Sequence, residues 1–108
     1  MVRERQAAAR DESGGAIQSV SDDEILEAYR LLAQEEGIFS EPASAACVAG
    51  LIKLAADSGQ RTAMRDETVV CVITGHGLKD PETALSVEGE MVEVPAEQAA
   101  VERAMGLR

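Results

Sequence analysis

The chain of 108 residues carries 20 acidic and 10 basic residues, which gives a formal net charge of -10. This length allows one domain at most, and the excess of negative charge argues against nucleic acids and anionic membranes as partners. No apolar run is long enough to cross a bilayer, and the amino-terminal residues lack the apolar core of a signal peptide, so we expect a cytoplasmic protein.

Three helices are expected in the first half of the chain. Residues 1–10 have a helical composition. Ser21 and Glu24 have the spacing of a capping box, which predicts a helix that ends near Gly37. A third helix should start at Glu41, with a proline in its first turn, and extend to residue 56. The first half of this helix is rich in small residues, so it can lie close to another backbone or to a planar ligand.

Two or three strands are expected as well. Residues 69–73 are five consecutive apolar and mostly β-branched residues, a pattern typical of a strand buried on both faces in a parallel sheet. Residues 16–20 could form an edge strand, and residues 91–94 an exposed strand or extended strap. We expect a polar connection over residues 57–66 and short helices after residue 80 and over residues 95–105.

This order of elements predicts an α/β fold. We expect a partial three-layer αβα parallel sheet, followed by a carboxyl-terminal extended strap and helix. So few strands leave the edges of a sheet unpaired, which predicts that sheet partners are missing when the chain is alone.

The most informative position is Thr74, directly after the expected central strand. Gly75 and Gly77 flank His76 there, and glycine permits a tight turn and a close approach of the backbone to a ligand. Ligands of open α/β sheets bind at the carboxyl ends of the strands. The hydroxyl of Thr74 is therefore a candidate ligand-binding group, although it could instead satisfy a turn amide.

Other reactive side chains have simpler interpretations. Cys47 and Cys71 lie in apolar runs, and their separation matches no metal-binding or redox motif, so we interpret both as buried apolar residues and expect no metal. His76 is the single histidine and could act as a general base. We favour a role as a polar residue of the turn.

Three motifs carry a resemblance to a known family: DESGG at residues 11–15, EGIFSEPASAA at 36–46 and VITGHGLKDP at 72–81. Together they resemble the threonine synthase family of fold type II pyridoxal-phosphate enzymes, which is related to the tryptophan synthase β subunit. The similarity runs from about residue 8 to residue 85 and matches the carboxyl-terminal third of that enzyme.

This resemblance implies pyridoxal 5'-phosphate as cofactor and the conversion of O-phospho-L-homoserine and water to L-threonine and phosphate, a lyase reaction. It implies that Thr74 hydrogen-bonds the pyridine nitrogen, and that Gly75, Glu41 and Ser44 lie beside the cofactor. It also implies that the Schiff-base lysine belongs to an earlier part of the enzyme, because Lys79 matches a non-catalytic position. We expect no catalytic residue in this segment.

We therefore expect the carboxyl-terminal segment of a threonine synthase, inactive alone and completed by the missing amino-terminal portion or by a homo-oligomer. Residues 1–85 would form part of the catalytic domain, and residues 86–108 the strap and helix. The alternative is a stand-alone acidic interaction or regulatory module. A segment of a threonine dehydratase or cysteine synthase is disfavoured by the residues at 74–77. The enzyme interpretation would be overturned by a helix or a solvent-facing edge at residues 69–73, or by a Thr74 hydroxyl sealed in packing with no cleft beside it.

Overall fold

Helices dominate the computed structural model, which describes residues 1–87, 89 and 91–107. In chain order its elements are α1 (Val2–Ser13), α2 (Asp22–Glu36), the 3-10 helix η1 (Pro42–Ala45), α3 (Ala46–Ala56), α4 (Ser58–Ala63), the 3-10 helix η2 (Gly77–Lys79), α5 (Pro81–Ser86) and α6 (Gln98–Ala104). Of the expected carboxyl-terminal segment, Glu88, Glu90 and Arg108 lie outside the described residues.

Helix α2 forms as its sequence predicts. The Oγ of Ser21 accepts a hydrogen bond from the amide of Glu24 (3.2 Å), and the Glu24 carboxylate accepts one from the amide of Ser21 (2.7 Å). This capping box satisfies two amides that the first turn of a helix leaves without partners. Gly37 ends the helix with φ of 65°, a left-handed conformation that glycine adopts without strain.

A small core forms where α2 packs against η1 and α3. Helix α2 contributes Ala28, Tyr29 and Leu32, and the facing segment contributes Ala45 and Ala49. The alanines allow the two backbones to approach closely, and Tyr29 supplies most of the bulk. This packing places η1 and the start of α3 in a fixed position.

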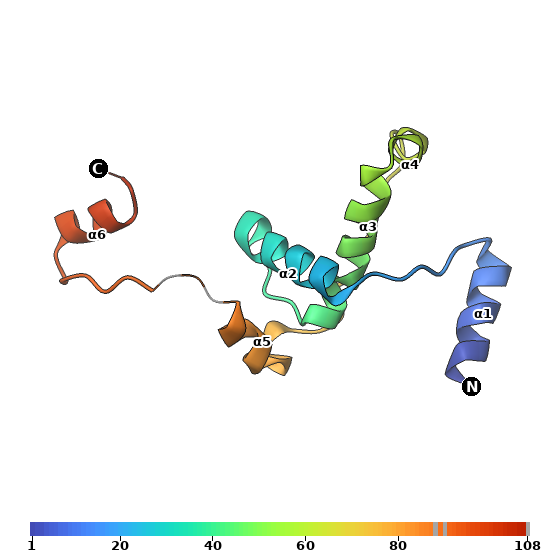
Figure 1. Cartoon of the computed structure of the whole chain (residues 1–108), viewed down its shortest axis with the longest axis horizontal. Coiled ribbons are helices and arrows are strands. Elements are labelled where there is room, and N and C mark those ends of the chain that lie inside the picture. Colours follow the sequence, from blue (N-terminus) through green and yellow to red (C-terminus); the bar gives the residue numbers. More distant parts are fainter. Residues whose placement is uncertain (88, 90, 108) are drawn as a thin grey trace.

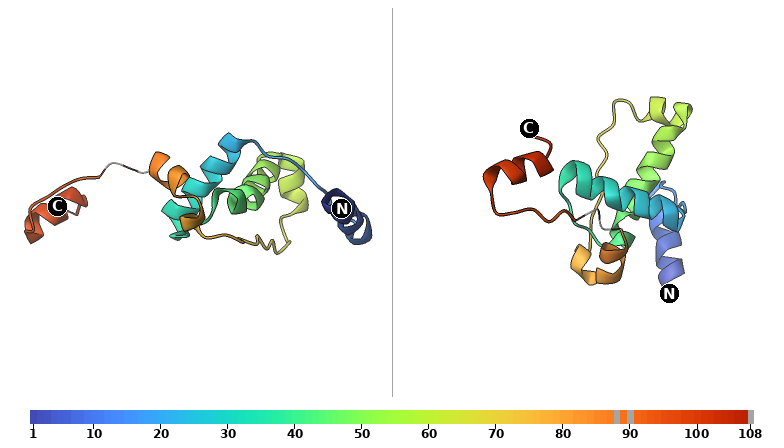
Figure 2. Two further views of the ribbon diagram at one scale, coloured as in Figure 1. Left: turned by 90° about the horizontal axis from the view of Figure 1, so that it is seen from below. Right: turned by 60° about the vertical axis from the view of Figure 1, so that its left-hand side comes forward.

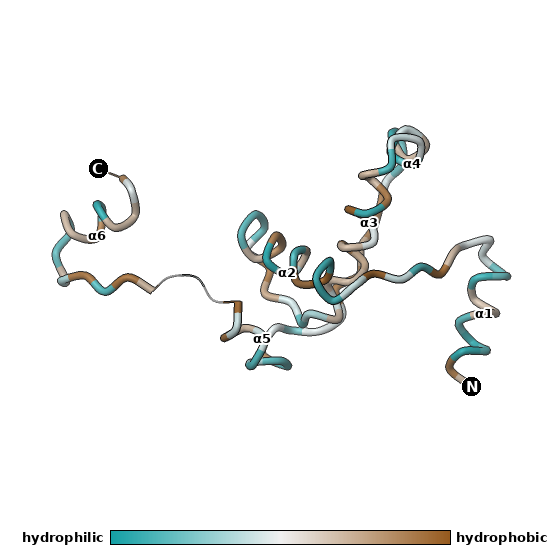
Figure 3. The backbone as a smooth tube through the Cα atoms, viewed as in Figure 1, coloured by the Kyte–Doolittle hydropathy of each residue, from teal (hydrophilic) through white to brown (hydrophobic). Residues whose placement is uncertain are grey.

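The ends of the chain extend away from this core. Figures 1 and 2 show α1 and α6 at opposite ends of the long axis, with α2, α3 and α5 between them. The radius of gyration is 18.6 Å, whereas a compact domain of this length has a value of roughly 13 Å. Hydrophobic residues lie along the extended segment before α6 (Figure 3), where Met91 is 84% exposed. Much apolar surface therefore has no partner in this structure.

The predicted α/β fold with a partial parallel sheet is wrong for this structure. The described residues contain no strand, and their one isolated bridge joins Ser40 to His76. Residues 69–73 are extended, but Val70 is 79% exposed and Val72 68% exposed, so the segment is not buried on both faces. Residues 16–20 and 91–94 form no strand either. A strand requires a neighbouring backbone, and no amide of residues 68–73 donates to another described residue.

Most of the predicted helices are confirmed, with shifted ends. Helix α1 continues to Ser13, and α6 begins at Gln98 instead of residue 95. The helix expected from Glu41 is divided into η1 and α3. The polar connection predicted over residues 57–66 is wrong in part, because α4 forms there with the Asp57 carboxylate accepting from the amide of Gln60 (2.9 Å).

Candidate cofactor site

Two segments meet at the candidate site: residues 39–41, which precede η1, and residues 75–77, which lead into the first residue of η2. The amide of Glu41 donates to the carbonyl of Gly75 (2.8 Å), and the amide of Gly77 donates to the carbonyl of Phe39 (3.0 Å). These hydrogen bonds flank the antiparallel bridge between Ser40 and His76. The pairing holds the turn after residue 74 against the beginning of η1.

Ser44 connects η1 to the candidate residue Thr74. Its side chain is buried, and its Oγ accepts from the amide of Gly75 (2.8 Å) while lying 3.0 Å from Thr74 Oγ1. A hydroxyl has one proton and two acceptor sites, so Ser44 can accept from the amide and still donate to Thr74. Thr74 itself is exposed. Its own proton is then available to an acceptor outside the chain.

Glu41 lies directly beside Gly75 and explains why a glycine is needed there. A Cβ atom at position 75 would collide with the Glu41 carboxylate and lie 2.9 Å from Glu41 Cβ. The carboxylate also pairs with Nζ of Lys79 at 3.5 Å. Because the Lys79 side chain is 71% exposed, this ion pair contributes at most about 1 kcal/mol to stability.

His76 takes part in the turn through both its ring and its backbone. Its Nδ1 accepts from the amide of Leu78 (3.1 Å), which caps η2. Its ring meets the edge of Phe39, with centroids 5.5 Å apart and an interplanar angle of 81°. A Cβ atom at Gly77 would strike the Phe39 ring. These are the contacts of a residue that shapes a turn.

The structure thus brings together the four residues that the resemblance nominates: Thr74, Gly75, Glu41 and Ser44. Their role in holding a cofactor stays a prediction. One observation suits a ring that presents a hydrogen-bond acceptor: the exposed Thr74 hydroxyl backed by Ser44.

Sequence analysis assigned no role to two neighbours of the site. Phe39 contacts the turn through its ring, and the available signal was the glycine at 77, which makes room for it. Ser40 is 1% exposed, and its Oγ has no hydrogen-bond partner within the described part of the chain. No sequence pattern indicated this burial.

The interpretation of both cysteines as buried is wrong, because Cys47 is exposed and Cys71 half-buried. The thiol of Cys47 donates to the carbonyl of Ser44 (3.3 Å), so it belongs to the surroundings of the site.

Comparison with known proteins places the chain in a class. Residues 2–75 match the family described as pyridoxal-phosphate dependent enzyme. The chain therefore belongs to the pyridoxal-phosphate dependent enzyme family, and the expected cofactor, pyridoxal phosphate, is confirmed as the cofactor of that family. No helix in the described residues has the length and apolar character needed to span a membrane.

Within this class, the chain is similar to proteins named threonine synthase. It is 50% identical over 99 residues to that of Mycobacterium tuberculosis (strain ATCC 25618 / H37Rv), covering 92% of the chain and 27% of the relative. It is 59% identical over 78 residues to that of Halalkalibacterium halodurans, covering 72% and 21% respectively. It is 46% identical over 91 residues to that of Methanocaldococcus jannaschii, covering 84% and 22%.

The resemblance to threonine synthase that the three motifs predict is therefore confirmed. The chain spans about a quarter of the length of the curated relatives it matches.

Proposed function

We propose that this chain supplies one wall of the pyridoxal-phosphate site of a threonine synthase, which converts O-phospho-L-homoserine and water to L-threonine and phosphate. The observation that carries the proposal is the hydrogen-bonded group of Ser44, Thr74 and Gly75, formed by motifs of the resemblance that lie about thirty residues apart. The similarity to proteins named threonine synthase supports the choice of reaction.

In this proposal Thr74 contacts the pyridine nitrogen of the cofactor. Ser44 donates to Thr74 Oγ1, and Thr74 donates its own proton to the ring nitrogen. A neutral hydroxyl partner leaves this nitrogen unprotonated, whereas a carboxylate partner would favour the protonated form. When bound, the cofactor supplies an electron-withdrawing ring to the substrate. The chain's own contribution is to position that ring and to set its protonation.

In this proposal Gly75 and Glu41 lie beside the pyridine ring of the cofactor and support it. The carbonyl of Gly75 is held by the amide of Glu41, so the peptide after Thr74 keeps one orientation. Lys79 is assigned no covalent role, because its ammonium group is paired with Glu41 and its side chain is exposed. A lysine that attacks a carbonyl needs a neutral amine, which burial favours and an ion pair opposes.

The proposal includes a polypeptide partner that supplies the rest of the site. Apolar surface without a partner supports it, for example at Val70 and Val72. That partner would be the missing amino-terminal portion of the enzyme or a further copy of the chain, and the chain alone would be inactive. We assign residues 1–85 to the catalytic domain and residues 86–108 to the strap and helix. The two free thiols support a cytoplasmic location.

The test is reconstitution. The chain is mixed with the part of a threonine synthase relative that it does not match, and phosphate release from O-phospho-L-homoserine is measured with pyridoxal phosphate present. We expect activity only in the mixture. If the two polypeptides form a complex without activity, or form none, the proposed function is overturned and a binding module becomes the better interpretation.

A second arm tests the role of Thr74. Replacing Thr74→Ala removes one hydrogen bond to the ring and should lower turnover about 10- to 100-fold, which corresponds to roughly 1.4–2.7 kcal/mol. Thr74→Ser keeps the hydroxyl and is the matched control, so it should retain most of the activity. Equal turnover for the alanine variant and the parent would show that this hydroxyl does not act on the cofactor.

A further inference from the structure

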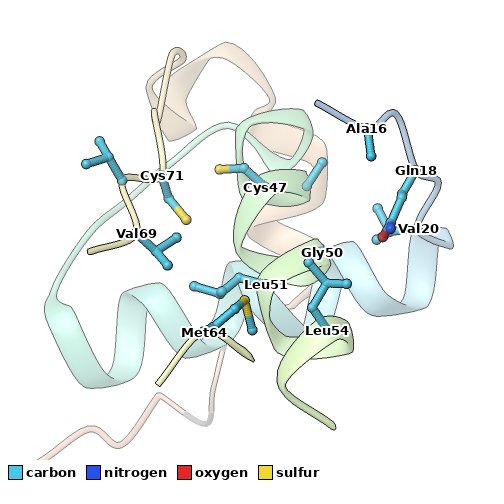
Figure 4. Close-up of a pocket in the computed structure, with 12 residues that line it drawn as sticks. Ala16, Gln18, Val20, Cys47, Gly50, Leu51, Leu54, Met64, Val69 and Cys71 are labelled. Carbon is cyan, nitrogen blue, oxygen red and sulfur yellow. The ribbon is translucent and has the colours of Figure 1, made fainter. Parts of the chain in front are cut away.

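The two cysteines meet in the groove next to the candidate site. Cys47 lies in the first turn of α3, three residues after Ser44, and Cys71 precedes Thr74 by three residues. The Sγ of Cys47 lies 3.6 Å from the carbonyl oxygen of Val72, the neighbour of Cys71. Figure 4 shows both sulfur atoms in the gap between α3 and the extended segment.

We propose that Cys47 and Cys71 are a modification site that closes as an intramolecular disulfide when the chain meets a low-molecular-weight disulfide. The facing thiols, the shared groove and the contact of Cys47 with the backbone next to Cys71 carry this inference. It does not depend on the proposed function, since neither the cofactor nor the substrate takes part.

The chemistry balances in two exchange steps. The thiolate of Cys47 attacks one sulfur of the small disulfide, which forms a mixed disulfide and releases one small thiolate. The thiol of Cys71 loses its proton to solvent and attacks the Sγ of Cys47, which forms the internal bond and releases the second small thiolate. The two protein thiols are oxidised, and the small disulfide is reduced to two thiols.

The surroundings determine which thiol reacts first. Cys47 is exposed on the groove, so it can meet the small disulfide directly. Burial raises the pKa of the Cys71 thiol, and the neighbouring Cys47 side chain raises it further. Cys71 therefore forms its thiolate less readily than an ordinary cysteine and suits the second, intramolecular step.

The disulfide would join α3 to the segment that leads into Thr74. Ser44 is one helical turn from one sulfur, and Thr74 is three residues from the other. The bond would therefore add a covalent link beside the contact between Ser44 and Thr74, which the chain with free thiols already forms.

The test uses the full chain with oxidised glutathione at about pH 8, where thiolates form. We expect both thiols to disappear, the intact mass to fall by two hydrogens, and non-reducing tryptic digestion to give one peptide pair that joins Cys47 to Cys71. Closure in buffer should be about tenfold or more faster than in concentrated urea, because the fold holds the thiols together.

Two single variants complete the test. Cys47→Ser and Cys71→Ser each leave one thiol without its partner, so each should end as a stable mixed disulfide with glutathione. The proposal is overturned if the parent chain ends with two glutathione adducts, forms disulfide-linked dimers instead, or closes at the same rate in urea as in buffer.

Discussion

Replacing Ser44 by alanine should loosen the turn at Gly75 selectively. The Ser44 hydroxyl is the acceptor for the Gly75 amide and the partner of Thr74, at 2.8 and 3.0 Å. The Ser44→Ala variant keeps the small size of the side chain but leaves the part-buried amide without an acceptor. An unsatisfied buried amide costs about 1–3 kcal/mol. Thr74 is exposed, so water can replace its lost partner at little cost.

This free-energy cost predicts how much faster the amide of Gly75 exchanges its hydrogen in the Ser44→Ala variant. Because each 1.4 kcal/mol is about a factor of ten, the amide of Gly75 should exchange roughly 5- to 150-fold faster in Ser44→Ala than in the parent. The measurement is amide exchange by NMR on the isolated chain. Ser86→Ala is the matched control, since it removes a serine hydroxyl that donates to the carbonyl of Thr83 (2.8 Å) in an exposed helix. That variant should leave Gly75 unchanged.

Two results would refute the reasoning. One is a Gly75 amide that exchanges within about twofold of the parent in Ser44→Ala, which would mean that the hydroxyl contributes little to holding the turn. The other is a Gly75 amide that already exchanges like an unprotected one in the parent, which would contradict the hydrogen bond itself.

The remaining predictions concern the turn, a helix cap and a lysine. Gly77→Ala should destabilise the turn by about 1–3 kcal/mol in thermal melts because its Cβ would strike Phe39, whereas Gly50→Ala, with open space around it, should preserve or raise stability. Hydrogen bonding to the capping serine and a nearby lysine lowers the pKa of Glu24. The stabilisation of α2 by ionised Glu24 is therefore fully present above pH 4.5, the ordinary pKa, and is lost as pH falls through the lowered pKa. Circular dichroism should show that the Glu24→Gln variant loses less helix on acidification than the parent. Lys79→Ala should change turnover of the reconstituted enzyme less than about threefold, because an exposed ion pair contributes little; loss of activity would give this lysine a catalytic role.

Val69, Val70 and Val72 are 48%, 79% and 68% exposed, whereas Ile73 packs against the core, so the solvent-facing outcome that was expected to overturn the enzyme interpretation is met in part. Burial of this segment as a central strand was the reason to expect a ligand at Thr74, and the structure does not bury it. The family match over residues 2–75 and the similarity to proteins named threonine synthase do not depend on that strand. They carry the interpretation together with the contacts of Ser44.

Local signals in the sequence determined both ends of α2. Ser21 and Glu24 complete a capping box within four residues, and Gly37 ends the same helix. Such hydrogen bonds join neighbours in the chain, so residue types at fixed spacing are enough to predict them. The motifs themselves likewise indicated the family and its cofactor, because sequence similarity needs no coordinates.

Tertiary structure alone decided the contacts between distant residues. Residues 69–73 have the composition of a strand, but a strand also needs hydrogen bonds from a second backbone, which the described residues do not provide. The approach of Ser44 to Thr74, and of Cys47 to the backbone beside Cys71, likewise depends on how α3 packs beside the extended segment. No residue pattern specifies that packing, because it arises from the summed burial of small side chains on two separate elements.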